Sequence, residues 1–247
     1  VNFNGEQYFE TDIIPLMTLT QAMGQPKGNK KGISFNFGNK NFEGKLYYGF
    51  IPYGDSKHPH PVFFKRVAAI QKGKAKIDIV GQLRGRYDMI HWEEKGYGTL
   101  GFRVVSSSGQ IFYDGKVSFS GKGPFEVVST VIEGPFLNRM TPTSVTISYT
   151  THEAASTTLS IDGREITSNG QTQHEILVEN LSPETTYEYT VTVGPIVQTY
   201  KLTTSPETGS RKPFVFAYAS DSRAGQGGGE RDIYGANAYI MKKIMAL

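Results

Sequence analysis

Short runs of alternating apolar and polar residues, separated by glycine-containing turns, fill the first half of the chain. In Lys74–Val80 the apolar residues Ala75, Ile77 and Ile79 alternate with charged or polar ones, which is the period of a strand with one buried face. The runs of this character are Lys45–Tyr53, Pro61–Ile70, Lys74–Val80, Tyr97–Ser106 and Ile111–Ser120. They predict a β-sandwich-like module over residues 1–124, in which Gly24–Lys31 is a loop.

A second series of alternating runs follows the glycine-rich turn at Gly121–Pro124. In Ser144–Thr150 the apolar side chains occupy one face of the expected strand and Thr146 and Ser148 the other. Thr158–Ile161 followed by Asp162-Gly163 predicts a hairpin. Further strands are expected at His174–Val178, Tyr187–Val193 and Tyr200–Thr204. These runs predict a second β-sandwich over residues 125–205.

The last part of the chain has a different pattern. Residues 206–213 are rich in Pro, Gly and Ser and form a predicted linker. Phe214–Ala219 is continuously apolar, which is typical of a strand buried on both faces in an α/β layer. Tyr234–Leu247 carries the apolar stripe of a helix. The expected fold is therefore mainly β, with tandem sandwiches followed by the first strand and helix of an α/β domain at residues 214–247.

Composition narrows the chemistry. The 247 residues include no cysteine, which excludes disulfides, zinc–thiolate sites and thiol catalysis. No apolar run is long enough for a transmembrane helix, so we expect no transmembrane segment.

Charge is unevenly distributed along the chain. Residues 1–127 carry 17 Lys and Arg against 11 Asp and Glu, whereas the whole chain has a net charge of only +3. A net charge this small does not indicate nucleic-acid binding. The basic excess is either a solvated lysine-rich face or a surface for an anionic partner such as a glycan or a membrane.

The second module resembles fibronectin type III domains. The segment Leu181–Tyr187, LSPETTY, matches the L-x-P-x-T-x-Y corner of that family, in which the tyrosine hydroxyl bonds to nearby backbone. Tyr149 stands where the family usually has a tryptophan. The resemblance implies a sandwich of about 80 residues.

The order of the modules resembles purple acid phosphatases and related calcineurin-like metallophosphoesterases. The match includes Glu133-Gly-Pro135, His174 and the strand ending at Asp221. The resemblance implies that Asp221 binds one metal of a site that holds two divalent ions in the complete enzyme. Such a site hydrolyses phosphate mono- or diesters with metal-bound hydroxide. The alternative is that Asp221 only caps a turn.

One position departs from that family. Where the common pattern is Asp-x-His, this chain has Asp221-Ser-Arg223, and arginine does not ligate metals. Arg223 is instead a candidate contact for a substrate phosphate, or it is a structural arginine. The family's later motifs have no counterpart before Leu247, so we expect the chain as given to be inactive alone and assign no catalytic residue.

Weaker candidates have simpler interpretations. His58 and His60 lie in a proline-rich turn without a neighbouring carboxylate, and Gly225–Gly229 lacks the P-loop residues, so a loop and a flexible linker are favoured. His152 and His174 are expected to be polar strand or loop residues. Trp92 could stack on a sugar, but core packing is favoured.

Three functional hypotheses follow. The first is the N-terminal portion of a secreted metallophosphoesterase, periplasmic or extracellular, acting on a phosphate-ester substrate. The alternative is a non-catalytic tandem β-sandwich that serves as a binding or adhesion module. In a third, a second polypeptide completes the catalytic domain by pairing with the edge of Phe214–Ala219.

Overall fold

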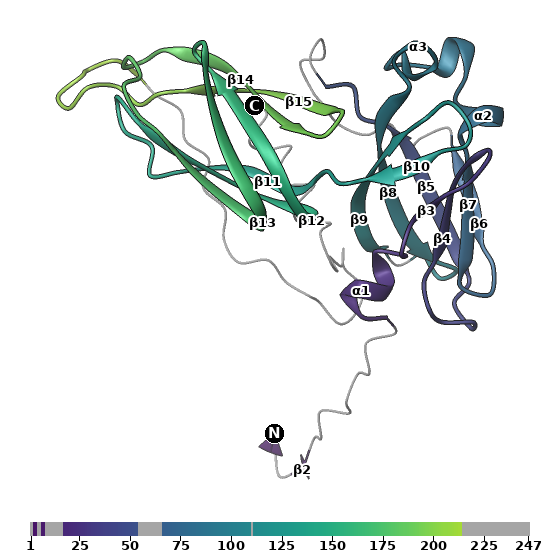
Figure 1. Ribbon diagram of the computed structural model, residues 1–247. Helices are drawn as coiled ribbons and strands as arrows, with labels where there is room; N and C mark the ends of the chain where they lie inside the picture. The colour runs from purple at the N-terminus through teal and green to yellow at the C-terminus, as the bar shows by residue number, and fades with distance from the viewer. Residues whose placement is uncertain (1, 4–5, 8–16, 54–65, 110, 214–247) are drawn as a thin grey trace.

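The computed structural model describes residues 2–3, 6–7, 17–53, 66–109 and 111–213, and these form a mainly β protein with few helices (Figure 1). Apart from the short ribbon of β1 (Asn2–Phe3) and β2 (Glu6–Gln7), the strands make two β-sandwiches. Residues 214–247 lie outside the described residues, and so does the predicted α/β portion.

The first sandwich has two antiparallel sheets. The larger sheet has the order β10-β9-β8-β5-β6, and the smaller one has the order β3-β4-β7. The strands of the larger sheet are β5 (Gly44–Phe50), β6 (Val67–Ile70), β8 (Tyr97–Ser106), β9 (Ile111–Ser120) and β10 (Glu126–Val128). The smaller sheet contains β3 (Lys27–Gly28), β4 (Gly32–Asn36) and β7 (Lys74–Asp78). The prediction of short strands joined by turns is confirmed for the described residues, with two corrections. β3 lies inside the predicted loop Gly24–Lys31. The strand predicted over Lys74–Val80 ends at Asp78, because the Asp78 side chain accepts the Gly81 N–H and caps a helical turn that begins at Ile79.

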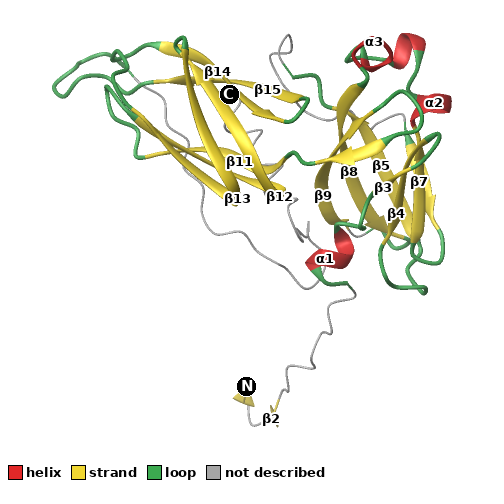
Figure 2. Cartoon of the chain, in the orientation of Figure 1, coloured by secondary structure: helices red, strands yellow, loops and turns green. Residues whose placement is uncertain are grey.

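Helical turns close the ends of this sandwich (Figure 2). They are α1 (Leu19–Ala22), α2 (Ile79–Gln82), the 3-10 turn η1 (Gly85–Tyr87) and α3 (Trp92–Lys95). No helix among the described residues is long and apolar enough to cross a membrane.

An aromatic core fills the space between the two sheets. Phe35 of β4 packs edge-on against Phe102 of β8, with ring centroids 5.0 Å apart. Trp92 is 2% exposed, and its indole N–H donates to the Leu83 carbonyl at 2.7 Å, so it belongs to the core as expected. Phe125 packs on Trp92 and β10 pairs with β9, which places the predicted boundary at 124 inside the first sandwich.

The second sandwich is built from long strands that pass from one layer to the other. Its strands are β11 (Val131–Asn138), β12 (Val145–Ile161), β13 (Arg164–Val178), β14 (Thr186–Val193) and β15 (Ile196–Thr203). The first half of β12 pairs with β11 and with the end of β13, whereas its second half pairs with β14 and with the start of β13. The pairing changes through a register shift between Thr150 and Ala155, so two continuous strands supply both layers.

Two local predictions for this sandwich are confirmed. Asp162 and Gly163 both have positive φ, 52° and 70°, as a two-residue hairpin turn between β12 and β13 requires. At the corner before β14, the backbone N–H of Ser182 donates to the Tyr187 hydroxyl at 2.8 Å. This is the tyrosine corner of a fibronectin III-like sandwich.

Candidate ligand-binding site

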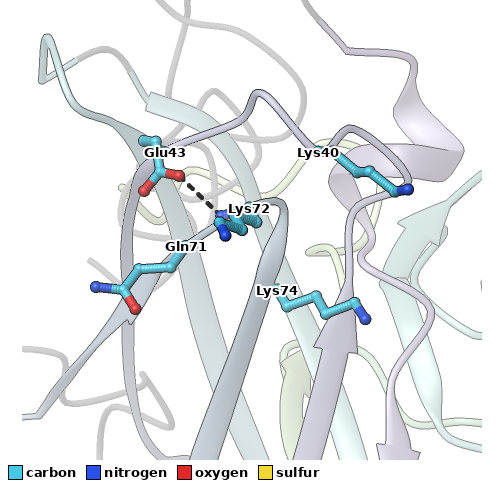
Figure 3. Close-up of a pocket in the computed structure, with 5 residues that line it drawn as sticks. All are labelled: Lys40, Glu43, Gln71, Lys72 and Lys74. Carbon is cyan, nitrogen blue, oxygen red and sulfur yellow. Dashed lines mark hydrogen bonds between the residues drawn. The ribbon is translucent and has the colours of Figure 1, made fainter.

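A lysine-lined depression of about 750 Å³ lies at one end of the first sandwich (Figure 3). Its lining residues are Lys40, Glu43, Gln71, Lys72 and Lys74. Lys40 and Glu43 come from the loop between β4 and β5, Gln71 and Lys72 come from the turn between β6 and β7, and Lys74 begins β7. We call this depression the lysine pocket.

The turn that carries Lys72 has a conformation that its sequence requires. Gln71 and Lys74 form a bridge, and between them Lys72 and Gly73 have φ values of 51° and 68°. Such a turn needs two residues in the left-handed region, which glycine occupies without strain. A Cβ on Gly73 would also lie only 2.1 Å from the Asn39 carbonyl oxygen, so glycine is required for packing as well.

Backbone hydrogen bonds fasten this turn to the loop beside it. The Gly73 N–H donates to the Phe42 carbonyl at 2.9 Å, and the Phe37 N–H donates to the Gly73 carbonyl at 2.8 Å. The Lys72 N–H donates to Glu43 Oε1 at 2.8 Å, as the dashed line in Figure 3 shows. The two segments that supply the lysines are therefore held together before any ligand binds.

The pocket presents three ammonium groups and one carboxylate. All of the lining lysines are exposed, and the only carboxylate among the lining residues, that of Glu43, accepts a backbone hydrogen bond. Each lysine ammonium offers three donors and a full positive charge to an anion. The arrangement can bind a phosphate, sulfate or carboxylate group.

A second, polar depression of about 510 Å³ lies on the outer side of the β11–β12–β13 layer. Its exposed lining includes Phe136, Gln171, Gln173 and Glu175. His174 lies beneath it and is 1% exposed.

Hydroxyl groups surround the buried His174 ring. Its Nδ1 lies 2.9 Å from Ser168 Oγ and 3.3 Å from Thr157 Oγ1, and its Nε2 lies 3.3 Å from Thr151 Oγ1. The ring stacks on Tyr149 with centroids 4.8 Å apart. Burial lowers the pKa of His174, which is opposed in part by a hydrogen bond with the Gln171 backbone. His174 is therefore a buried polar strand residue, as the sequence favoured.

The residues that the sequence singled out as candidates for metal or phosphate binding are not among those described. Asp221, Arg223, His58, His60 and Gly225–Gly229 all lie outside the described residues. Among the residues that the structure does describe, no group of three or more His, Cys, Asp or Glu side chains could hold a metal ion. His152 is only half-buried, and its Nδ1 lies 3.8 Å from Oε1 of the neighbouring Glu153.

Sequence reasoning missed the lysine pocket. The available signal was the segment Gln71-Lys-Gly-Lys74 between two alternating runs, which has the composition of a two-residue hairpin turn. The approach of Lys40 could not be inferred, because it depends on the docking of a distant loop through Phe37, Phe42 and Gly73.

Comparisons with known proteins found little. No family model matches the sequence, and no curated protein matches it. Among solved structures, the chain is similar to the "Central Fibronectin-III array of RIM-binding protein", with 13% sequence identity, a TM-score of 0.33 and coverage of 76% of this chain and 72% of that chain. The feature of the second sandwich that agrees with the fibronectin III resemblance is its tyrosine corner.

Proposed function

We propose that the two sandwiches form a non-catalytic binding module and that the lysine pocket is its site for an anionic group. The observation that carries this proposal is that Lys40, Lys72 and Lys74 line one depression, on a loop and a turn that are already fastened to each other by hydrogen bonds. A preorganised site loses less conformational entropy when a ligand binds. Because the pocket is open to solvent, the attraction is screened by salt and the affinity for a single anion is modest.

Substitution of the three lysines tests the proposal directly. In the full chain, Lys40→Gln, Lys72→Gln and Lys74→Gln together remove three charges but keep long polar side chains. We expect the amide NMR signals of Lys72 and Gly73 to shift when a sulfated disaccharide is titrated into the wild type. The triple variant should bind that probe roughly fivefold more weakly or worse.

A matched control separates the pocket from net charge. Lys45, Lys95 and Lys201 are exposed and lie outside the pocket. Substituting these three with glutamine should leave the titration unchanged. Equal weakening in both triple variants, or no change in the pocket variant, would contradict the proposal.

The metallophosphoesterase hypothesis stays a prediction about residues 214–247. It holds that Asp221 binds one of two divalent ions and that Arg223 contacts a phosphate-ester substrate, in a periplasmic or extracellular enzyme completed by further chain or by a second polypeptide. Only the sequence resemblance supports it. Metal analysis of the longest natural form against an Asp221→Ala variant tests it, with Asp162→Ala as a control at an exposed turn. Equal metal content in all three proteins would remove the assignment.

A further inference from the structure

The outer face of the smaller sheet in the first sandwich is lined with lysines. In the strand register, Ser34 lies opposite both Lys76 and Lys27, and Asn36 lies opposite Lys74. Residues paired in this way share a face of the sheet, and the alternate residues of β4 and β7, such as Ile33 and Ile77, are buried beneath them. Lys27, Lys74 and Lys76 therefore project to solvent from one surface.

This face continues into the lysine pocket at one end and into a basic turn at the other. Lys74 belongs to both the sheet and the pocket, and Lys30 and Lys31 lie in the turn between β3 and β4. We call the whole surface the lysine strip. Its members are Lys27, Lys30, Lys31, Lys40, Lys72, Lys74 and Lys76, and all are exposed. Since a strand rises by about 3.3 Å per residue, Lys74 and Lys76 of β7 lie roughly 7 Å apart along the strip.

Two of the carboxylates near the strip already have structural roles. Glu43 accepts the Lys72 backbone N–H, and Asp78 accepts the Gly81 backbone N–H at 2.9 Å at the start of α2. Glu126 of β10 lies at the edge of the strip beside Gly28. Seven lysines against these three carboxylates leave the surface with a clear positive excess.

The basic turn is as well ordered as the pocket. The Asn29 carboxamide oxygen accepts the backbone N–H groups of Lys31 and Gly32 at 2.9 and 3.0 Å, and its nitrogen donates to Ser34 Oγ at 2.8 Å. Both ends of the strip are thus fixed relative to the sheet.

We propose that the lysine strip binds a linear acidic polysaccharide lengthwise, with one acidic group in the lysine pocket. This inference rests on the proposed function of the pocket and extends it to a ligand class. Repeated charges along a linear polymer match lysines that are spaced along strands, and Ser34 and Asn36 place polar groups between those lysines. Binding at several points raises the effective concentration at each further point.

The surface fits this ligand better than other polyanions. Single-stranded nucleic acids are held by aromatic side chains that stack on the bases, and the strip consists of lysines with Ser and Asn between them. Stable attachment to a membrane usually pairs a basic patch with an apolar or lipid anchor. The exposed large apolar residues of the described first sandwich are Leu19, Val67 and Met89, and none belongs to the strands or turns that form the strip.

Chain length is the variable that tests this inference. The probes are a sulfated disaccharide and a long sulfated polysaccharide such as heparin, measured on the full chain by calorimetry. Per binding site, the wild type should bind the long probe at least roughly tenfold more tightly than the disaccharide. This gain in affinity should disappear at high salt. The far-end variant Lys27→Gln, Lys31→Gln and Lys76→Gln should lose most of the gain and still bind the disaccharide as the wild type does.

The possible outcomes separate the two proposals. If the pocket variant binds the disaccharide normally, the proposed function fails. If the pocket variant weakens binding but the far-end variant binds the long probe like the wild type, only the lengthwise inference fails. Tighter binding to single-stranded DNA, or to vesicles containing phosphatidylserine, would overturn the ligand class. The Lys45, Lys95 and Lys201 variant controls for charge, and thermal melts confirm that each variant folds.

Discussion

At the scale of single residues, His174 is a histidine buried in the second sandwich. It is 1% exposed, stacks on Tyr149 and meets three hydroxyl groups, with no carboxylate among its hydrogen-bonding partners. Burial disfavours the charged imidazolium, so the pKa of His174 in the folded protein lies below its ordinary value of 6.5.

This position predicts a loss of stability in mild acid. A histidine with a lowered folded-state pKa stabilises the fold fully above its unfolded pKa, and that contribution is lost as the pH falls through 6.5 toward the folded pKa. Each pKa unit by which the folded-state value lies below the unfolded value contributes at most about 1.4 kcal/mol to the free energy of unfolding. We therefore expect the free energy of unfolding to drop between about pH 7.5 and about pH 5. Urea unfolding of the wild type at a series of pH values across this range measures that free energy.

Two variants isolate the contribution of His174. His174→Gln removes the titrating ring, so its stability should depend less on pH than that of the wild type across the same range. His152→Gln removes a half-buried histidine from the same strand as Tyr149 and is the matched control for the substitution itself. If the free energy of unfolding depended on pH in the same way for the wild type and His174→Gln, burial of the His174 ring would not account for the loss of stability in acid.

At the scale of elements, the turn between β6 and β7 depends on Gly73 in two ways. Its φ of 68° is costly for any other residue, and a Cβ would collide with the Asn39 backbone. Gly109, in the turn between β8 and β9, has a φ of 87° but no atom within 4 Å of a Cβ. The two glycines therefore differ in packing while sharing a backbone constraint.

Alanine substitutions at these glycines should differ accordingly. Gly109→Ala carries the φ strain alone, about 1 kcal/mol, whereas Gly73→Ala must also displace the loop that carries Lys40. We expect Gly73→Ala to destabilise the chain by roughly 1–3 kcal/mol more than Gly109→Ala in urea denaturation. It should also weaken binding of the sulfated disaccharide, which Gly109→Ala should not affect. Equal effects of the two substitutions would contradict the docked-turn description.

For single elements, the sequence predicted the strand bounds well where one face of the strand is exposed to solvent. The bounds of β8 and β9, Tyr97–Ser106 and Ile111–Ser120, agree with the prediction, because apolar runs and turn residues mark their ends. The passage of β12 and β13 between two layers was not predicted, because alternation stops between the two expected runs of β12, at the register shifts between Thr150 and Thr157. β3 has only two residues and depends on pairing with β4. The lysine strip needed the strand register, which alternation along one strand does not specify.

At the scale of the whole molecule, polar side chains join the two sandwiches. Tyr53, which follows β5, packs edge-on against Tyr200 of β15 with ring centroids 5.9 Å apart. The Tyr200 hydroxyl donates to Gln198 Oε1, and Gln198 Nε2 donates at 3.0 Å to the hydroxyl of Thr130, which lies between β10 and β11. Burial raises the pKa of Tyr200 well above its usual range, so its hydroxyl stays protonated as a donor. These contacts run from the first sandwich into the second and end at the segment that connects the two.

Gln198 is hydrogen-bonded to both Tyr200 and Thr130, so its substitution should weaken the contact between the two sandwiches. Gln198→Ala removes both hydrogen bonds at a side chain that is 1% exposed and leaves the Tyr200 and Thr130 hydroxyls without these partners, at a cost of about 1–3 kcal/mol. We expect a lower melting temperature together with a broader range of angles between the sandwiches, measured by small-angle scattering and NMR relaxation. Val197→Ala, at a side chain that is 44% exposed on the same strand, should change neither. If Gln198→Ala lowered the melting temperature but left the angular range unchanged, the contacts would stabilise the second sandwich without fixing the orientation of the first.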